Sequence, residues 1–370
     1  MRNTSISPPP AWPTPGSHQR FIELELYALT PIYKGGSTTE QVDEGRPFRV
    51  PSIRGVLRYW WRATSTLASV EQLRAREEAI FGGVHGQRPI ASAVSVAVLA
   101  QKSTLGPRPG NKSYAFGVTG KEPEGEARNR QVHMSVKGRL RIEWHDNDAG
   151  KEVQRALKAW LLFGGIGGRS RRGAGSIWWS EGLDRPATVD DYVAAWRGLI
   201  PQRSTRPWLT LAKSVLLVGP ATKSADAAWT EGLDGMRDVR ASRDVRKPFV
   251  RVRGADLFEW KQQDYLKFGQ EGQFQSGRAA LGLPIRFQGT KGDYFLNPDG
   301  KNRYPSPVHL KVVQLGSSFH PVMLVLRGPM PGKISAVRTG GGTTPGTVAE
   351  SGLDRFLELA AQLPGWKRYV

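Results

Sequence analysis

Gly164-Gly-Ile-Gly-Gly-Arg-Ser-Arg-Arg-Gly-Ala-Gly175 decides the fold, because a helix pattern ends at this stretch and a strand pattern begins after it. Glycines at 164 and 165 are typical of a helix C-terminus, and Ser176-Ile-Trp-Trp-Ser180 predicts a strand. The order helix, loop, strand is the reverse of a P-loop or a dinucleotide-binding fingerprint. The helix is predicted because apolar side chains recur on one face, at Val153, Ala156, Leu157, Trp160 and Leu161.

The residues before this stretch complete a mixed α+β pattern. Residues 21–29 alternate polar and apolar side chains, which predicts a strand. A helix is expected over residues 53–61, with Ser52 as its N-cap. Further along we predict a helix over 71–81, strands over 90–99 and 136–144, and a loop over 102–131. This order is close to the βαββαβ order of a ferredoxin-like or RRM-type sandwich.

The pattern restarts after residue 188. We therefore predict an α+β protein of two ferredoxin-like (RRM-type) domains, residues 20–188 and 189–370, with insertions and a glycine-rich loop. Residues 1–19 hold five prolines and are expected to be a flexible tail. The elements expected in the second domain are helices over 190–199, 225–239 and 350–362, and strands over 208–218, 279–287, 308–315 and 322–327.

The charge of the chain indicates an anionic partner. Its 370 residues include 53 Lys and Arg against 33 Asp and Glu, a net charge of +20. Such a balance favours a nucleic acid over an anionic membrane surface, although a composition that serves solubility alone is the alternative. The absence of Cys excludes a disulfide framework, a thiolate zinc site and a Cys nucleophile. No membrane span or secretory signal is present, so we expect a cytoplasmic protein.

Five arginines follow one another over residues 46–62 with no acidic residue among them. Arg54, Arg58 and Arg62 are four residues apart, so on a helix they form one stripe. Like charges at this spacing repel, and solvent faces usually mix signs. We therefore predict an anion-binding strip that also includes Arg46 and Arg49, with a solvated helix face as the alternative.

The glycine-rich stretch offers a second anion-binding candidate. Its glycines let the backbone approach a ligand closely, and Arg169, Arg171 and Arg172 add charge-assisted donors. A phosphate backbone suits this combination, and a flexible surface loop is the alternative. Lys34 is a weaker candidate in the turn over residues 30–36. Residues 237–261 are either another basic surface or a salt-bridged solvent face, because Asp and Glu accompany the Arg and Lys there.

Catalytic and metal-binding patterns are missing. The six histidines form no HxH or HExxH pattern, so a metal ligand set is not expected. Glu40, Asp43 and Glu44 share one segment and could bind Mg²⁺, but a solvated polar loop is the expected reading. We therefore predict no catalytic residue, no metal and no cofactor.

Several of these motifs together resemble a known family. Gly165-Ile-Gly167 and Gly173-Ala-Gly175, separated by an Arg-rich spacer, are similar to the glycine-rich loop of the RAMP superfamily of CRISPR proteins. Further motifs in this sequence resemble one branch of that superfamily, the first RAMP subunit of the Cmr (type III-B) effector complex. These are Leu29–Gly36, Arg46-Pro47, Pro51–Arg62, Ala79–Gly83, Ala280–Pro284 and Pro305–Lys311. The Pro-rich tail and residues 100–135 are not matched.

The resemblance implies a non-catalytic, RNA-binding subunit that serves antiviral defence. It would hold guide RNA and target RNA near the 3′ end of the guide, beside other RAMP subunits, with no small-molecule substrate. One alternative is a related endonuclease that processes guide RNA by metal-free acid/base chemistry, with His18 or His85 as base. Another is a basic scaffold assembled by protein contacts alone. The predicted RNA-binding residues are Lys34, Arg46, Arg49, Ser52, Arg54, Arg58, Arg62, Gly165, Gly167, Gly168, Arg169, Ser170, Arg171 and Arg172.

Overall fold

The protein is seen here as a computed structural model. It describes residues 20–33, 42, 45–85, 88–116, 131–201, 206–241, 274–287, 294–301, 303–339 and 341–370. The architecture is mixed α and β, with sheets that are antiparallel apart from one strand pair. No helix in this part of the chain combines the length and the apolar character needed to cross a membrane.

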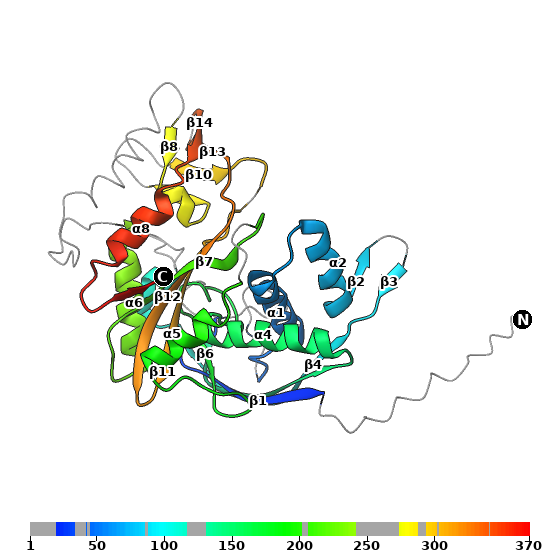
Figure 1. Cartoon of the computed structure of the whole chain (residues 1–370). Coiled ribbons are helices and arrows are strands. Elements are labelled where there is room, and N and C mark those ends of the chain that lie inside the picture. Colours follow the sequence, from blue (N-terminus) through cyan, green and yellow to red (C-terminus); the bar gives the residue numbers. More distant parts are fainter. Residues whose placement is uncertain are drawn as a thin grey trace, which may run out of the picture.

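The first half builds a four-stranded sheet covered on one face by two helices. The sheet order is β4-β5-β1-β6, and α1 and α4 pack side by side on it (Figure 1). A short helix α2 and the β2–β3 hairpin follow α1 on its outer side. The bounds are β1 Phe21–Ala28, α1 Val50–Thr64, α2 Val70–Phe81, β2 Gly83–His85, β3 Arg88–Ile90, β4 Val94–Pro107, η1 Gly110–Lys112, α3 Ser113–Phe116, β5 Gln131–Trp144, α4 Asn147–Phe163 and β6 Ile177–Trp179.

The second half repeats the same connectivity. Its four-stranded sheet has the order β11-β12-β7-β15, and the chain visits these strands and two helices in the sequence β7, α6, β11, β12, α8, β15. Counted within its half, each sheet therefore has its strands in the order second, third, first, fourth. The bounds are α5 Val189–Arg197, β7 Thr210–Val218, α6 Ala225–Ala241, β11 Val308–Leu315, β12 Ser318–Arg327, α8 Gly352–Ala360 and β15 Lys367–Tyr369.

A separate five-stranded sheet is inserted into the second half. Its order is β8-β14-β13-β10-β9, and it projects from the rest of the molecule in Figure 1. Part of it follows α6 and part follows β12, so it is built from two insertions. The bounds are β8 Phe274–Ser276, η3 Arg278–Leu281, β9 Ile285–Phe287, β10 Tyr294–Pro298, β13 Lys333–Arg338 and β14 Thr343–Val348.

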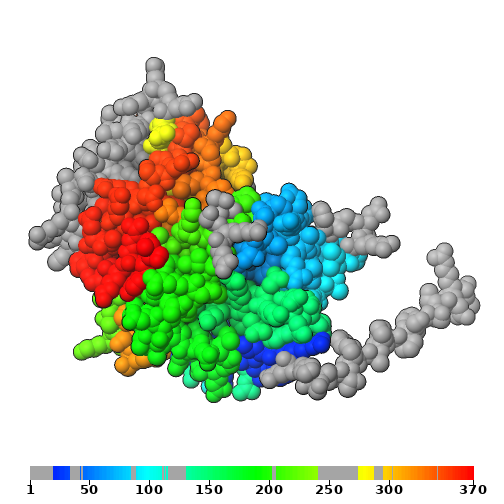
Figure 2. Space-filling model, viewed as in Figure 1, coloured from blue at the N-terminus to red at the C-terminus, as the bar shows by residue number. Residues whose placement is uncertain are grey.

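Strand β7 joins the cores of the two halves. Leu216 and Val218 on one of its faces belong to the core that contains α1 and α4. Val215 and Leu217 on the other face pack into the second core, with α6 and α8. Successive strand residues point to opposite faces, so β7 is buried on both sides. Figure 2 shows the resulting continuous body, with the green central part of the chain between the blue N-terminal helices and the red C-terminal segment.

Most predicted elements are present, and three predictions were wrong. The first helix begins at Val50, and its N-cap is Arg49 and not Ser52. The reason is that Pro51 fits the first turn of a helix, where a backbone N–H would have no hydrogen-bond acceptor within the helix. Strand β4 continues to Pro107, into the segment predicted to be a loop. The predicted strand over 279–287 is a 3₁₀ turn followed by the short strand β9.

Candidate nucleic-acid interface

An open cleft of about 650 Å³ lies where the two halves meet. Four parts of the chain line it: the first turns of α1, the glycine- and arginine-rich loop, residues 281–284, and residues 303–309. The end of α6 adds Arg240. All four parts overlap motifs that carried the family resemblance in the sequence, which are Pro51–Arg62, Gly165–Gly175, Ala280–Pro284 and Pro305–Lys311. The cleft therefore brings together motifs that lie more than 200 residues apart.

Among the described residues, five arginines and no carboxylate line this cleft. The arginines are Arg169, Arg171, Arg172, Arg240 and Arg303. None of them forms an ion pair with Asp or Glu among the described residues. Cations that are uncompensated in a concave surface concentrate the positive potential there. The cleft is therefore suited to an extended polyanion.

Two of the five arginines have part of their donor capacity occupied. Arg172 donates from Nη1 to the carbonyl oxygen of Tyr114 at 2.9 Å, and burial, with the charges of Arg240 and Arg169, lowers its pKa. Arg240 donates to the carbonyl oxygen of Leu281 at 3.3 Å. Neither carbonyl carries a net negative charge, so both guanidinium groups keep their charge uncompensated. Arg169 and Arg303 are exposed.

The glycine-rich loop is anchored to the rest of the protein, so the alternative of a flexible surface loop is wrong. Gly168 donates its N–H to the carbonyl oxygen of Tyr33 at 2.5 Å, and Gly175 donates to that of Pro31 at 2.8 Å. The carbonyl oxygen of Arg171 accepts from the N–H of Leu310 at 3.0 Å, which joins the loop to β11. These bonds hold both ends of the loop and leave its arginines at the cleft.

The glycines serve packing as well as ligand access. Gly167 and Gly175 have positive φ values of 84° and 62°, and a Cβ at either position would collide with a backbone carbonyl. Arg169 also has a positive φ of 62°, which is uncommon for a residue with a side chain. The N–H groups of Arg169, Ser170 and Arg171 donate to no acceptor in the described part of the chain. These three groups are therefore available to a ligand.

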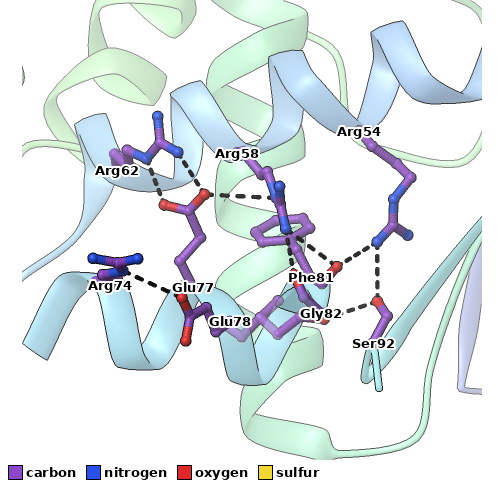
Figure 3. Close-up of polar contacts among 10 residues, drawn as sticks. Arg54, Arg58, Arg62, Arg74, Glu77, Glu78, Phe81, Gly82 and Ser92 are labelled. Carbon is purple, nitrogen blue, oxygen red and sulfur yellow. Dashed lines mark hydrogen bonds and ion pairs between the residues drawn. The ribbon is translucent and has the colours of Figure 1, made fainter. Parts of the chain in front are cut away.

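The arginine stripe of α1 does not line the cleft. Figure 3 shows Arg54, Arg58 and Arg62 turned toward the end of α2. Arg54 donates to the carbonyl oxygen of Phe81 at 2.5 Å, and Arg58 donates to that of Gly82 at 2.5 Å. Carbonyls at a helix C-terminus carry partial negative charge and attract cations. The stripe thus fixes α2 against α1.

Glu77 is the acidic partner that the stripe lacks within residues 46–62. Arg62 donates to both carboxylate oxygens of Glu77 at 2.5 Å, and Arg58 lies 3.5 Å from one of them. The Glu77 side chain is 11% exposed. The inference that the stripe has no offsetting acid was therefore wrong, because the acid arrives on the neighbouring helix. The role of these arginines in binding RNA stays a prediction.

Some of the other predicted site residues line the cleft and others do not. Ser52, Gly165, Arg169, Ser170, Arg171 and Arg172 line the cleft, whereas Arg46, Arg49, Gly167 and Gly168 do not. Lys34, the tail of residues 1–19 with His18, and the carboxylates Glu40, Asp43 and Glu44 lie outside the described residues. His85 is the last residue of the β2 strand.

The described part of residues 237–261 shows features of both predicted alternatives, a salt-bridged solvent face and a basic surface. Arg237 pairs with Asp234 at 2.9 Å and Asp238 at 3.3 Å, as a salt-bridged face requires. Arg240, one turn further along α6, lines the cleft instead. Residues 242–261 lie outside the described residues.

Four aromatic residues of the cleft were not predicted as site residues: Tyr59, Trp60, Tyr304 and His309. Tyr59 and Nε2 of His309 are hydrogen-bonded at 2.9 Å. Burial raises the pKa of the Tyr59 hydroxyl, and the charge of Arg171 offsets part of this rise. Burial and then the charge of Arg171 hold the pKa of His309 well below its ordinary value. Both groups are therefore neutral at pH 7.

The outer face of the first sheet has a different character. Its side chains pair across the strands, Glu25 with Arg139 at 3.5 Å and Glu23 with Arg141 at 3.4 Å. Such a ladder of alternating charges is already neutral, so it has little attraction for a polyanion. Among the described residues, no group of three or more His, Asp or Glu could hold a metal ion.

Comparison with known proteins finds one family match, within the first half of the chain. Residues 25–178 match the model of the RAMP superfamily, which confirms the resemblance indicated by the sequence motifs. A search of curated proteins found no match.

Two solved structures share the fold over nearly the whole chain. Cmr1 from Pyrococcus furiosus, in its apo form, has a TM-score of 0.58 at 17% identity, covering 94% of this chain and 98% of that chain. A chain of the type III-B Cmr-beta complex bound to cognate target RNA has a TM-score of 0.50 at 12% identity, covering 92% and 98%. At these identities the likeness shows a common fold.

Proposed function

We propose that this chain, which shares the RAMP fold with Cmr1, is a non-catalytic RNA-binding subunit of a type III-B CRISPR effector complex. The observation that carries the proposal is the cleft, whose lining in the described part of the chain holds five arginines and no carboxylate. Arginine presents a planar fork of donors that matches a phosphate group, so such a cleft favours a phosphodiester chain. A related chain belongs to a complex bound to target RNA, which supports RNA as the polyanion.

The fold organisation belongs to the same proposal. We propose that residues 20–188 and 189–370 are two ferredoxin-like domains with the cleft between them. The identical strand order of the two four-stranded sheets supports this division. The core shared through β7 would then be the interface that sets the width of the cleft.

RNA would contact the cleft mainly through its phosphates. Contacts to phosphates set the position of a strand but carry no base sequence, so affinity would be similar for unrelated RNA sequences. If five phosphates are neutralised, the log–log dependence of affinity on salt would have a slope of about −3.5 for a single strand. Base pairing between guide and target would then supply the specificity.

The direct test compares charge reversal inside and outside the cleft. Arg169→Glu combined with Arg303→Glu changes two exposed arginines of the cleft. Lys151→Glu combined with Lys158→Glu makes the same change in net charge on the exposed side of α4. We expect the cleft pair to weaken binding of a labelled 20-nucleotide RNA by about tenfold or more, and to reduce the salt slope by about 1.4.

The control pair should bind RNA nearly as the unchanged protein does. An equal loss in both pairs would mean that net charge, and not the cleft, drives binding. Wild-type affinity of the cleft pair would overturn the proposal. The measurement is fluorescence anisotropy at several salt concentrations, with at least two unrelated RNA sequences.

Membership of the complex and the position near the 3′ end of the guide need a different experiment. The tagged chain, purified from its own cells, should carry guide RNA and other RAMP subunits. Photo-crosslinks from thiouridine should reach the cleft when it is placed near the 3′ end of the guide and not when it is placed near the 5′ end. An assembly that survives RNase unchanged, with no crosslink to the cleft, would favour the scaffold alternative.

The non-catalytic assignment is tested with the purified chain alone. We expect intact RNA after incubation with either Mg²⁺ or EDTA. A metal-free nuclease needs a base and an acid with pKa values near the working pH. In the cleft the pKa of Tyr59 is raised and that of His309 is lowered, which moves both away from that range. Cleavage in EDTA would favour the endonuclease alternative.

A further inference from the structure

Arg171 is held by three separate elements of the fold. Its backbone belongs to the glycine-rich loop, and its carbonyl oxygen accepts from Leu310 of β11 at 3.0 Å. Its guanidinium carbon lies 5.3 Å from the ring centre of Tyr59, which is on α1. This distance is within the range of a cation–π contact. A long, flexible side chain is therefore restricted from both ends.

Tyr59 is in turn held by His309. The two side chains are hydrogen-bonded at 2.9 Å, and their ring centres are 5.6 Å apart. The His309 residue is 6% exposed, so the ring lies below the cleft surface. Its other aromatic neighbour is Trp60, at 5.2 Å between ring centres. A neutral imidazole in this place can accept the proton of the Tyr59 hydroxyl through Nε2.

We propose that Tyr59 and His309 are positioning residues that hold the Arg171 guanidinium in the cleft, ready for an RNA phosphate. The inference rests on the proposed function, because it assigns a role within the same cleft. Immobilising an arginine on binding has an entropic cost, and a side chain that is already restricted avoids part of it. By this mechanism the buried histidine acts on RNA binding without touching RNA.

Single and double variants of the full chain test this assignment by RNA affinity. Tyr59→Phe keeps the ring beside Arg171 but removes the hydroxyl whose bond to His309 fixes that ring, so the fold should be retained while the positioning is lost. We expect it to weaken RNA binding about threefold to tenfold, the range for one side chain that is no longer restricted. In the Arg171→Ala background, Tyr59→Phe should cause no additional loss, because the residue that it positions is absent.

Two controls separate positioning from other roles. In the Arg169→Ala background, Tyr59→Phe should cause its full loss of affinity, since Arg171 and not Arg169 is the cation–π partner of Tyr59. His309→Gln keeps a hydrogen-bond acceptor near the place of Nε2 and should lose less RNA affinity than His309→Leu. His309→Leu cannot accept the bond and should match Tyr59→Phe.

Each result that contradicts the proposal has its own meaning. If Tyr59→Phe still weakens binding in the Arg171→Ala background, the hydroxyl contacts RNA directly and the positioning role is wrong. If His309→Gln loses as much affinity as His309→Leu, packing and not the hydrogen bond is what matters, and the inference also fails. If Arg171→Ala and the cleft pair Arg169→Glu, Arg303→Glu all leave affinity unchanged, the proposed function fails instead. Melting temperatures of all variants exclude loss of fold as the cause.

Discussion

The side-chain ammonium of Lys311 donates to the carbonyl oxygen of Gly164 at 2.7 Å. Lys311 is in β11 of the second half, and Gly164 follows the last residue of α4 in the first half. A second bond, to the carbonyl oxygen of Leu161 at 2.5 Å, completes the cap of the helix. Because Gly164 lines the cleft, this buried lysine connects the two halves at the base of the proposed RNA site.

Replacing Lys311 should destabilise the protein. Lys311→Met keeps most of the volume but leaves two buried carbonyl oxygens without a donor. Each such group costs about 1–3 kcal/mol, partly offset because the amine, whose pKa is lowered by burial, no longer has to be taken out of water. We expect the free energy of unfolding in urea to fall by about 2 kcal/mol. Lys158→Met, on the exposed side of α4, is the control and should change it by less than about 0.5 kcal/mol. Equal values for both variants would contradict the role of the cap.

Gly175 should not tolerate a side chain. Its φ of 62° is unfavourable for other residues, and a Cβ would overlap the carbonyl oxygen of Ile166. Gly175→Ala should therefore lower the free energy of unfolding by about 2 kcal/mol or more. Gly55→Ala is the opposite case, because Gly55 is in α1 with nothing within 4 Å of the added carbon. It should raise stability by up to about 1 kcal/mol. Thermal unfolding of both variants checks the pair, and a neutral Gly175→Ala would show that the loop can rearrange.

Glu77 should matter for stability and not for RNA binding. Glu77→Gln removes the charge that Arg58 and Arg62 share, which leaves two arginines without a carboxylate. We expect the free energy of unfolding to fall by about 1–3 kcal/mol. Glu78→Gln is the matched control, because Glu78 pairs with Arg74, which is 59% exposed, and a smaller loss is expected.

The same variant tests the arginine stripe in RNA binding. Once released from Glu77, Arg62 and Arg58 would be free to contact phosphates. Since they face α2 and not the cleft, RNA affinity should stay within about twofold of the unchanged protein. A clear rise in affinity for Glu77→Gln but not for Glu78→Gln would support the strip that the sequence predicted.

Stability should fall in acid because of His309. Its pKa in the folded protein lies well below the ordinary 6.5, through burial and the charge of Arg171. Below pH 6.5 the unfolded chain binds a proton at this residue that the folded chain does not bind, so the free energy of unfolding decreases as pH falls. The decrease approaches about 1.4 kcal/mol per pH unit. This decrease should be absent from His309→Gln. The free energies of unfolding of the two proteins, measured by urea titration from pH 8 to pH 5, should therefore diverge below pH 6.5. Parallel curves would contradict the assignment.

The helices were predictable because their signals are local. Ile53, Leu57, Trp60 and Trp61 recur at helical spacing, and all four are buried in the structure. The second helix of this kind ends at Gly164, as the glycines after it indicated. The start of α1 was misplaced by three residues, because Ser52 has the residue type of an N-cap but follows a proline that the first turn accepts.

The five-stranded sheet was not predictable from local patterns. Its strands β8 and β9 have three residues each, too short for an alternation of polar and apolar residues to be recognised. It is also assembled from two insertions far apart in the chain, Phe274–Pro298 and Lys333–Val348. Pairing between such segments depends on the tertiary fold, which brings their edges together.

The order of the main elements, the excess of positive charge and the arginines of the glycine-rich loop are all visible in the amino-acid sequence. Which of the arginines stay uncompensated depends on how the chain folds. Arg62 and Arg171 both lie in basic stretches, and the sequence does not distinguish them. In the fold, α2 brings Glu77 against Arg62, whereas the neighbour of Arg171 is Tyr59 and not a carboxylate. The physical reason is that the field at a charge depends on distance in space. The groups that compensate it, or leave it free for a ligand, come from parts of the chain that only folding brings near.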